Sequence, residues 1–184
     1  MAAYTVPEIA LSSMVVSPDL TGSLGFVYTC AGRSDDAMET LKRAVEMDPS
    51  RPGGHFFLGH FYLFKSMYKE ALDEYGKAME LSEEMSLWPE MFIGITYAKM
   101  GKPDKAREVL ANQLERSKQQ YISSFMFALL HFALGNNDEG FKLLDKAYEE
   151  RDPTLCWLKI HGLLESVPSD PRYTALLKKM NLDK

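Results

Sequence analysis

Apolar residues recur along this chain at helical spacing, and the same few positions return every 34 or 35 residues. No segment shows sustained alternation of apolar and polar residues, so the pattern predicts helices and no strands. Four columns keep this register, occupied in turn by Gly25, Gly59, Gly94 and Ala128; by Tyr28, Tyr62, Tyr97 and His131; by Ala37, Ala71, Ala106 and Gly140; and by Leu41, Tyr75, Leu110 and Leu144. A fifth column reads Ala44, Ala78, Gln113 and Ala147. This period indicates a chain that stacks one small structural unit several times.

Each copy of the repeat is predicted to contain two helices. In the first copy a helical run over about residues 20–31 ends at a glycine, Gly32, which can adopt the left-handed conformation of a helix C-cap. A second run, over about residues 36–47, ends at Asp48-Pro49 because proline cannot continue a helix. Small residues in the first and third columns let the two antiparallel helices approach closely. We expect the Tyr and Leu columns to fill the wedge beyond that contact.

The first copy carries the most complete motif. It reads Leu24-Gly25-x2-Tyr28-x3-Gly32-x4-Ala37-x3-Leu41-x2-Ala44-x4-Pro49. This spacing resembles that of the tetratricopeptide repeat, with Thr21 where the family has a leading Trp. The second and third copies match the same motif and the fourth is degenerate. The resemblance implies an all-α protein, a right-handed α-α superhelix (solenoid) of four helix-turn-helix repeats.

The register also predicts how the chain is divided. We place the repeats at about residues 18–51, 52–86, 87–120 and 121–154. Residues 1–17 have two interpretations, the remnant of a preceding repeat or a genuine N-terminal helix. Residues 155–184 form a predicted C-terminal capping segment. Asp152-Pro153, just before this segment, and Asp170-Pro171, within it, are each predicted to begin a helix. The last of these helices is amphipathic, as a helix that covers the final repeat should be.

Charge and cysteine content argue against several classes of function. With 21 Lys and Arg against 26 Asp and Glu and no basic block, the chain lacks the surface expected for nucleic acid or an anionic membrane. No stretch approaches the roughly 18 apolar residues of a membrane-spanning helix, and the N-terminus lacks the basic start of a signal peptide. Cys30 and Cys156 do not form a secreted disulfide framework. We therefore expect a cytoplasmic protein.

Candidate catalytic and metal-binding groups are sparse. The histidines, His55, His60, His131 and His161, form no pair at the spacing of metal ligands on a helix. Neither cysteine has a CxxC partner or a histidine nearby. We therefore expect no catalytic residues, no metal and no cofactor.

The first helix of each copy carries a second apolar face, opposite the one that packs within the repeat. The resemblance to tetratricopeptide repeats implies that these first helices line an inner, concave surface. The candidate peptide-binding residues on this face are Phe26, Phe56, His60, Leu63, Phe64, Trp88, Met91, Ile95, Lys99, Phe125, Leu129 and Phe132.

A helix that is apolar on both sides has to be covered by something. One interpretation is self-coverage, by tight superhelical curvature, by residues 6–16 or by the tail helix. The other is that an apolar or amphipathic peptide or helix of a protein partner, or of a second copy of the chain, docks in the groove. The latter makes the protein a non-catalytic protein–protein interaction module.

The tail supports an alternative function. The stretches "DP…WLK" and "SDPRY…LLKKMNL" are similar to the ends of repeat arrays attached to bacterial transcriptional regulators, adenylate cyclases and serine/threonine kinases. That resemblance implies a C-terminal regulatory or oligomerisation module of a larger signalling protein.

Overall fold

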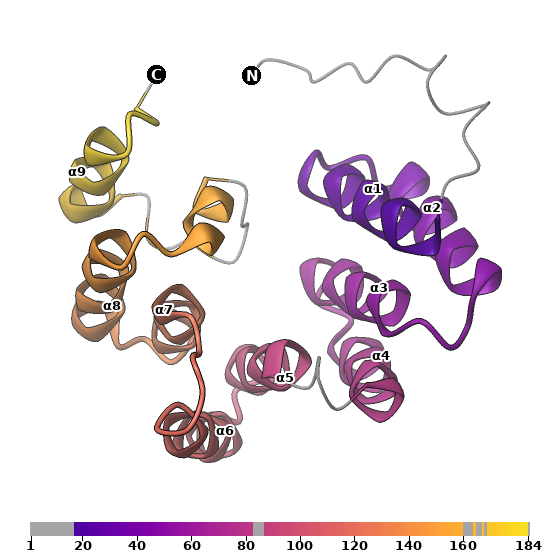
Figure 1. Ribbon diagram of the computed structural model, residues 1–184, viewed down its shortest axis with the longest axis horizontal. Helices are drawn as coiled ribbons and strands as arrows, with labels where there is room; N and C mark the ends of the chain where they lie inside the picture. The colour runs from indigo at the N-terminus through magenta and orange to yellow at the C-terminus, as the bar shows by residue number, and fades with distance from the viewer. Residues whose placement is uncertain (1–16, 83–86, 160–163, 165–166, 168, 184) are drawn as a thin grey trace. The chain divides into compact units, whose positions relative to one another are not determined.

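A computed structural model describes residues 17–82, 87–159, 164, 167 and 169–183, and these residues form helices with no strand among them (Figure 1). The all-α prediction is confirmed. The chain divides into two compact units, Met1–Glu83 (unit 1) and Glu84–Lys184 (unit 2). Each unit is described by itself.

Unit 1 contains two helical hairpins. Helices α1 (Pro18–Cys30) and α2 (Ser34–Met47) form the first, and α3 (Pro52–Phe64) and α4 (Tyr68–Leu81) form the second. Both α1 and α3 begin with proline, which is favourable at the first helical position because the missing N–H would have no partner there. Helix α3 packs against both α1 and α2, so the second hairpin stacks directly on the first.

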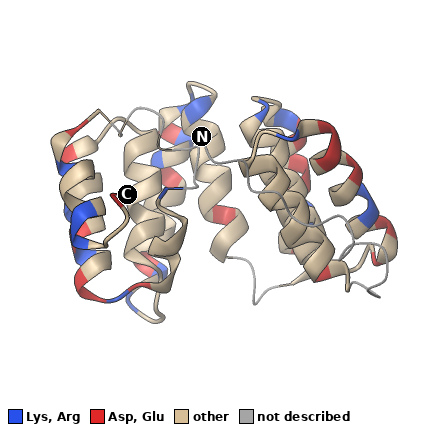
Figure 2. Cartoon of the chain, turned by 90° about the horizontal axis from the view of Figure 1, so that it is seen from above, with Lys and Arg blue, Asp and Glu red and all other residues tan. Residues whose placement is uncertain are grey.

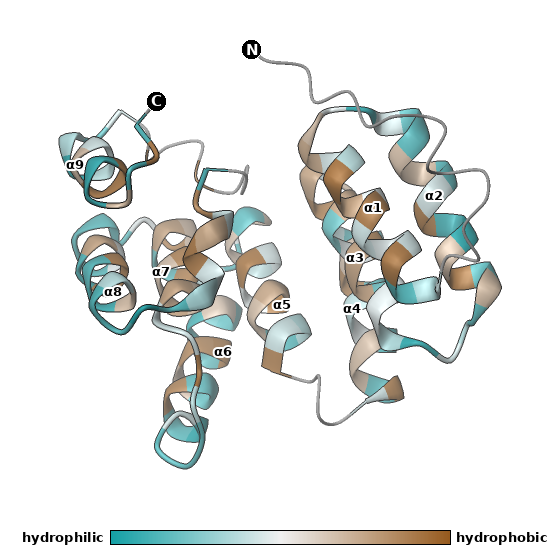
Figure 3. Ribbon diagram, turned by 45° about the horizontal axis from the view of Figure 1, so that its top comes forward, coloured by the Kyte–Doolittle hydropathy of each residue, from teal (hydrophilic) through white to brown (hydrophobic). Residues whose placement is uncertain are grey.

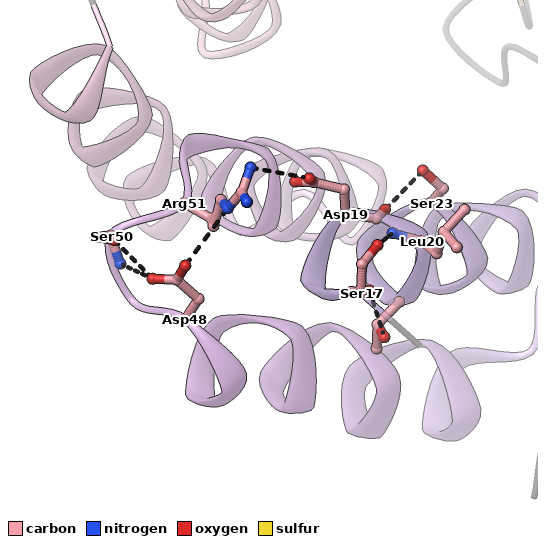
Figure 4. A network of polar contacts seen from close by, with 8 residues as sticks. Ser17, Asp19, Leu20, Ser23, Asp48, Ser50 and Arg51 are labelled. Atoms are coloured by element: carbon pink, nitrogen blue, oxygen red, sulfur yellow. Dashed lines mark hydrogen bonds and ion pairs between the residues drawn. The ribbon is translucent and has the colours of Figure 1, made fainter. Parts of the chain in front are cut away.

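A polar network fixes the connection between these hairpins (Figure 4). The Asp48 carboxylate accepts hydrogen bonds from the backbone N–H and the hydroxyl of Ser50, at 3.1 and 2.6 Å. The Arg51 guanidinium then bridges Asp48 and Asp19, at 3.4 and 3.2 Å. The network ties the start of α3 to the end of α2 and to the first turn of α1.

A second set of contacts, between His55 of α3 and Glu74 of α4, also stabilises the connection between α2 and α3. The Nδ1 atom of His55 lies 2.6 Å from Oε2 of Glu74, and its Nε2 atom lies 3.1 Å from the carbonyl oxygen of Pro49. Lys77 Nζ donates to the other oxygen of Glu74 at 2.7 Å. His55 and Glu74 are both buried, so this pair joins α3, α4 and the α2–α3 connection within the interior of unit 1.

Unit 2 contains two further hairpins and a closing helix. Its elements are α5 (Leu87–Lys99), α6 (Pro103–Arg116), α7 (Ser124–Ala133), α8 (Asn137–Glu149), a 3₁₀ turn η2 (Pro153–Trp157) and α9 (Pro171–Lys179). Helix α7 packs against α5 and α8, and α9 packs against α8. As Figure 3 shows, hydrophobic residues recur along α1, α3, α5 and α7, whereas α2, α8 and α9 carry many hydrophilic residues.

The predicted small-residue columns are confirmed as sites of close helix contact. A Cβ atom added to Gly25 would lie 2.5 Å from Cγ of Leu41, and one added to Gly59 would lie 2.7 Å from the Tyr75 ring. Leu41 and Tyr75, both of the fourth column, therefore pack directly on these glycines, and not only in the wedge beyond them as expected. In the fourth copy the arrangement is reversed, since Gly140 on the second helix faces Phe132 on the first.

The turns inside the hairpins use left-handed residues, as predicted for Gly32. Gly32, Gly101 and Gly135 have φ angles of 73°, 71° and 78°, in the left-handed region that only glycine enters without steric cost. In the second copy Ser66 takes this conformation, with φ of 58°.

Helix α9 lies against α8 through both apolar and charged contacts. Tyr173 and Leu176 are buried, and the Tyr173 hydroxyl donates to the carbonyl of Leu158 at 3.2 Å. The Arg172 guanidinium lies 4.1 Å above the centre of the Phe141 ring and also pairs with acidic side chains of α8 and of the α9 cap. Elsewhere charges of both signs are interspersed along the helices (Figure 2).

Candidate binding surface

The twelve predicted peptide-binding residues divide by burial. Trp88 and Lys99 are exposed, and Phe64 is half-buried. The other nine are less than a tenth exposed, namely Phe26, Phe56, His60, Leu63, Met91, Ile95, Phe125, Leu129 and Phe132. Most of the second apolar face of the first helices is thus covered within the chain.

In unit 1 the structure brings three of these residues together in an aromatic cluster. The His60 ring lies 4.4 Å from the Phe56 ring and 5.4 Å from the Phe26 ring, centre to centre. The Tyr75 ring of α4 joins at 5.6 Å from His60. The His60 Nδ1 atom is 3.0 Å from the carbonyl oxygen of Phe56. The cluster packs α1, α3 and α4 together.

In unit 2 the buried members lie on α5 and α7, which pack against each other. Trp88, in the first turn of α5, is 39% exposed. Beside it is a hollow of about 150 Å³. This surface, the Trp88 hollow, is lined by Leu87, Trp88, Met91, Tyr121, Ile122, Ser123, Met126, Asp152, Pro153 and Thr154.

The hollow lies where the fourth copy departs from the repeat. Helix α7 has 10 residues, whereas α1, α3 and α5 have 13 each. Residues 117–123, which include the predicted start of the fourth repeat at 121, form turns, a bend and backbone without regular secondary structure instead of a helix. Tyr121 in this segment is 66% exposed and forms one wall of the hollow.

A buried carboxylate lies beneath the Trp88 hollow. The Ser123 hydroxyl donates to Oδ2 of Asp152 at 2.6 Å, and the backbone N–H and hydroxyl of Thr154 donate to Oδ1 at 2.9 and 2.6 Å. Burial opposes ionisation of Asp152, but these hydrogen bonds favour the carboxylate and lower its pKa below the usual value. Asp152 therefore stays negatively charged at neutral pH.

The same surroundings also shift the pKa of the Tyr121 hydroxyl. Its pKa is raised, first by desolvation, then by the negative charge of Asp152, by a hydrogen bond to that carboxylate and by the negative charge of Glu150.

Sequence reasoning identified Trp88 and Met91 but missed the other lining residues. Asp152-Pro153 was predicted as a helix start, and Asp152 does cap η2. Its second role, accepting a hydrogen bond from Ser123, joins residues 29 positions apart. Nothing in the local sequence signals that contact.

A second hollow, of about 450 Å³, lies between α6 and α8 in unit 2. Leu114, Phe127 and Leu143 contribute apolar lining, and Lys146 and Glu150 lie among its polar groups. Glu150 is already engaged, since it accepts a hydrogen bond from Ser124 at 2.9 Å and lies 3.6 Å from Lys146. Lys146 and Glu150 thus partly neutralise each other, whereas no described cation forms an ion pair with Asp152.

Within the part of the chain that the structure describes, no group of three or more His, Cys, Asp or Glu side chains is placed to hold a metal ion. None of the described helices is long and apolar enough to cross a membrane.

Stacked helical hairpins with glycine-mediated contacts define a helical-repeat protein, and comparison with known families agrees. Sequence models described as tetratricopeptide repeat match residues 22–51, 53–85 and 93–154. The chain belongs to the tetratricopeptide repeat family, as its first copy indicated.

Individual relatives are more distant. The chain is similar to protein bimA of Emericella nidulans, with 31% identity over 98 residues, which cover 53% of this chain and 12% of that protein. Among solved structures it resembles a thermophilic tetratricopeptide repeat protein of Thermus thermophilus, with a TM-score of 0.62 and 22% identity over 93% of this chain and 87% of that one. A crystal structure of MamA gives a TM-score of 0.49, with 24% identity over 76% of this chain and 81% of that one. At 22% identity the Thermus thermophilus structure establishes the fold alone.

Proposed function

We propose that this protein is a non-catalytic interaction module that binds an apolar or amphipathic segment of a partner protein, with the Trp88 hollow as its anchor point. Tetratricopeptide repeats form a protein-interaction fold, in which stacked hairpins present an extended surface to a partner. The observation that carries the proposal is a pair of exposed aromatic side chains, Trp88 and Tyr121, at the edge of an apolar hollow. Trp and Tyr are enriched among the residues that dominate binding energy.

The size of the hollow favours a side chain over a free small molecule. Pockets for small molecules enclose roughly 300–1,000 Å³, whereas the Trp88 hollow encloses about 150 Å³. That volume suits one large side chain projecting from a peptide. Met91 and Met126 line the hollow, and flexible thioether side chains adapt to differently shaped partners.

Of the twelve residues predicted from the sequence, Trp88 contacts the partner directly in this proposal, and Met91, although buried, lines the hollow. The buried residues of α5 and α7, such as Ile95 and Phe125, hold the two helices at the separation that leaves the hollow between their first turns. Replacing them would test folding, not binding.

The test is selection of peptides against the wild-type chain, followed by measurement of their affinity for two variants. Peptides from a displayed random library are titrated by fluorescence polarisation against wild type, Trp88→Ala and Trp157→Ala. We expect the selected peptides to share a large side chain flanked by apolar residues, and Trp88→Ala to weaken binding about tenfold or more, as for an interface hot spot.

Trp157→Ala is the matched control, since Trp157 is also exposed in unit 2 but does not line the hollow. It should bind the selected peptides as wild type does. Circular dichroism checks that both variants fold. Peptides that bind both variants equally well would contradict the proposal, and so would a library that yields no binder.

A further inference from the structure

The Trp88 hollow has an unbalanced charge. Of its lining residues Asp152 alone carries a charge at neutral pH, and no Lys, Arg or His lines the hollow. Asp152 forms no ion pair within the described residues. Its hydrogen-bond donors are neutral groups, namely the Ser123 and Thr154 hydroxyls, the backbone N–H groups of Thr154 and Phe125 and the Tyr121 hydroxyl. They stabilise the carboxylate through hydrogen bonds without supplying a positive charge.

The rest of the lining suits a cation that carries apolar atoms. The exposed rings of Trp88 and Tyr121 offer π faces, and such faces attract ammonium and guanidinium groups, Trp most strongly. Elsewhere in the chain some tyrosine rings already have a cation of the protein nearby, for example Lys179 at 5.9 Å from the exposed Tyr148 ring and Lys105 at 5.2 Å from the half-buried Tyr97 ring. The rings of the hollow lie instead among apolar side chains and one carboxylate.

We propose that the anchor side chain bound by the Trp88 hollow is an ammonium of the lysine type, free or methylated, and that Asp152 and the two rings select it over a neutral side chain. The four-carbon stem of lysine lies against Met91, Ile122 and Met126, as long charged side chains do on apolar surfaces. The ammonium then lies near the rings, in the negative potential of Asp152. This inference rests on the proposed function, because it names the chemistry of the anchor in the same site.

The geometry disfavours the other kinds of anchor. An acidic side chain would be repelled by Asp152, whose carboxylate already accepts hydrogen bonds at both oxygens. A neutral apolar side chain would gain the contacts with Met91 and Met126 but nothing from the charge. A partner with a lysine in or beside an apolar stretch therefore complements the hollow best.

The experiment uses Trp88 as its own reporter. The full chain with Trp157→Phe retains Trp88 as its one tryptophan, so its emission reports on the hollow. The probes are capped peptides of identical sequence that differ at one central residue, which is lysine, trimethyllysine, norleucine or glutamate. Norleucine keeps the lysine stem without the ammonium.

We expect lysine or trimethyllysine to bind about fivefold or more tightly than norleucine at low salt, and glutamate to bind most weakly. Added salt should narrow the gap between lysine and norleucine, because it screens the attraction to Asp152. Tyr121→Leu, which keeps an apolar wall, and Asp152→Asn should each reduce the preference for the cation. Asp104→Asn, at an exposed acid of α6 outside the hollow, is the matched control and should preserve it.

Norleucine binding as tightly as lysine would overturn this inference and leave the proposed apolar anchor standing. No binding by any of the four probes, or binding that does not change Trp88 emission, would count against both. If Asp152→Asn does not fold, Tyr121→Leu alone decides, because Tyr121 is largely exposed and its replacement leaves the core intact. An unchanged preference for lysine in Tyr121→Leu would overturn the role given to the ring.

Discussion

The contact between Gly59 and Tyr75 gives a quantitative test of how the hairpins are built. Tyr75 is fully buried, and a Cβ atom at position 59 would lie 2.7 Å from its Cδ1 and Cε1 atoms. Non-bonded carbons are comfortable at about 3.5–4.0 Å. Gly59→Ala therefore forces α3 and α4 apart by roughly 1 Å or drives the Tyr75 ring from its site. Overpacking of this kind costs about 1–3 kcal/mol.

The same unit provides a matched control. Gly76 lies inside α4, and a Cβ atom added there would meet nothing within 4 Å. Both substitutions gain up to about 1 kcal/mol because alanine favours a helix more than glycine does. That gain cancels in the comparison. The stability difference between Gly76→Ala and Gly59→Ala should thus equal the overpacking cost, about 1–3 kcal/mol, with Gly76→Ala the more stable.

Urea unfolding followed by far-ultraviolet circular dichroism measures this difference directly. We expect the midpoint to rise for Gly76→Ala and to fall, or stay level, for Gly59→Ala, with equal m values. An equal rise in both variants would refute the reasoning, since it would mean that Tyr75 does not press on Gly59.

Three further substitutions test other contacts. Glu74→Gln removes the carboxylate beside the buried ring of His55, and we expect a loss of about 1–3 kcal/mol in urea unfolding. The pKa of Asp152 is lowered in the folded protein, so its ionisation stabilises the fold above about pH 4. This contribution to the free energy of unfolding is lost as pH falls through the pKa of the folded state. The stability gap between wild type and Asp152→Asn should accordingly narrow from pH 7 to pH 3, and a constant gap would contradict the assignment. Arg172→Ala should speed hydrogen exchange in α9, because it removes the cation above the Phe141 ring, and unchanged exchange would show that this contact does not hold the helix.

Much of the fold was predictable because the repeat constrains it many times over. A glycine in the first column requires a helix partner at close range, and the period repeats this demand in several copies. The repeat pattern did not predict which side chain of the second helix packs against each glycine. At Gly94 that neighbour is Val109 and not the column residue Leu110, since one position along a helix changes the direction of a side chain by about 100°.

Gln113 is a second case in which the repeat pattern does not predict the contacts of a side chain. The sequence marks it as the departure from an alanine column, which indicates that something differs in the third copy. The structure shows what differs, since the fully buried Gln113 donates from Nε2 to Glu90 at 2.7 Å and Arg116 donates to the same carboxylate oxygen at 2.6 Å. Glu90 lies 23 positions away in another helix, so no local pattern links the two residues.

The candidate site was harder to predict for the same physical reason. Twelve residues were chosen because they continue the apolar face of a regular helix, and regular helices in a stacked array cover one another's faces. Nine of the twelve are buried in that way. Trp88 escapes because it lies in the first turn of α5, beside a copy whose own first helix begins late.

The site therefore depends on the interruption of the repeat more than on the repeat itself. Had residues 121–123 continued α7 by another turn, their backbone would be bonded within the helix and Ser123 would not be its cap. Because α7 begins at Ser124, the Ser123 side chain accepts from the backbone of Met126 and donates to Asp152. The same break leaves Tyr121 projecting beside the hollow. Regular columns stabilise the array, whereas the interruption before α7 leaves Tyr121 exposed and places Ser123 where it donates to Asp152.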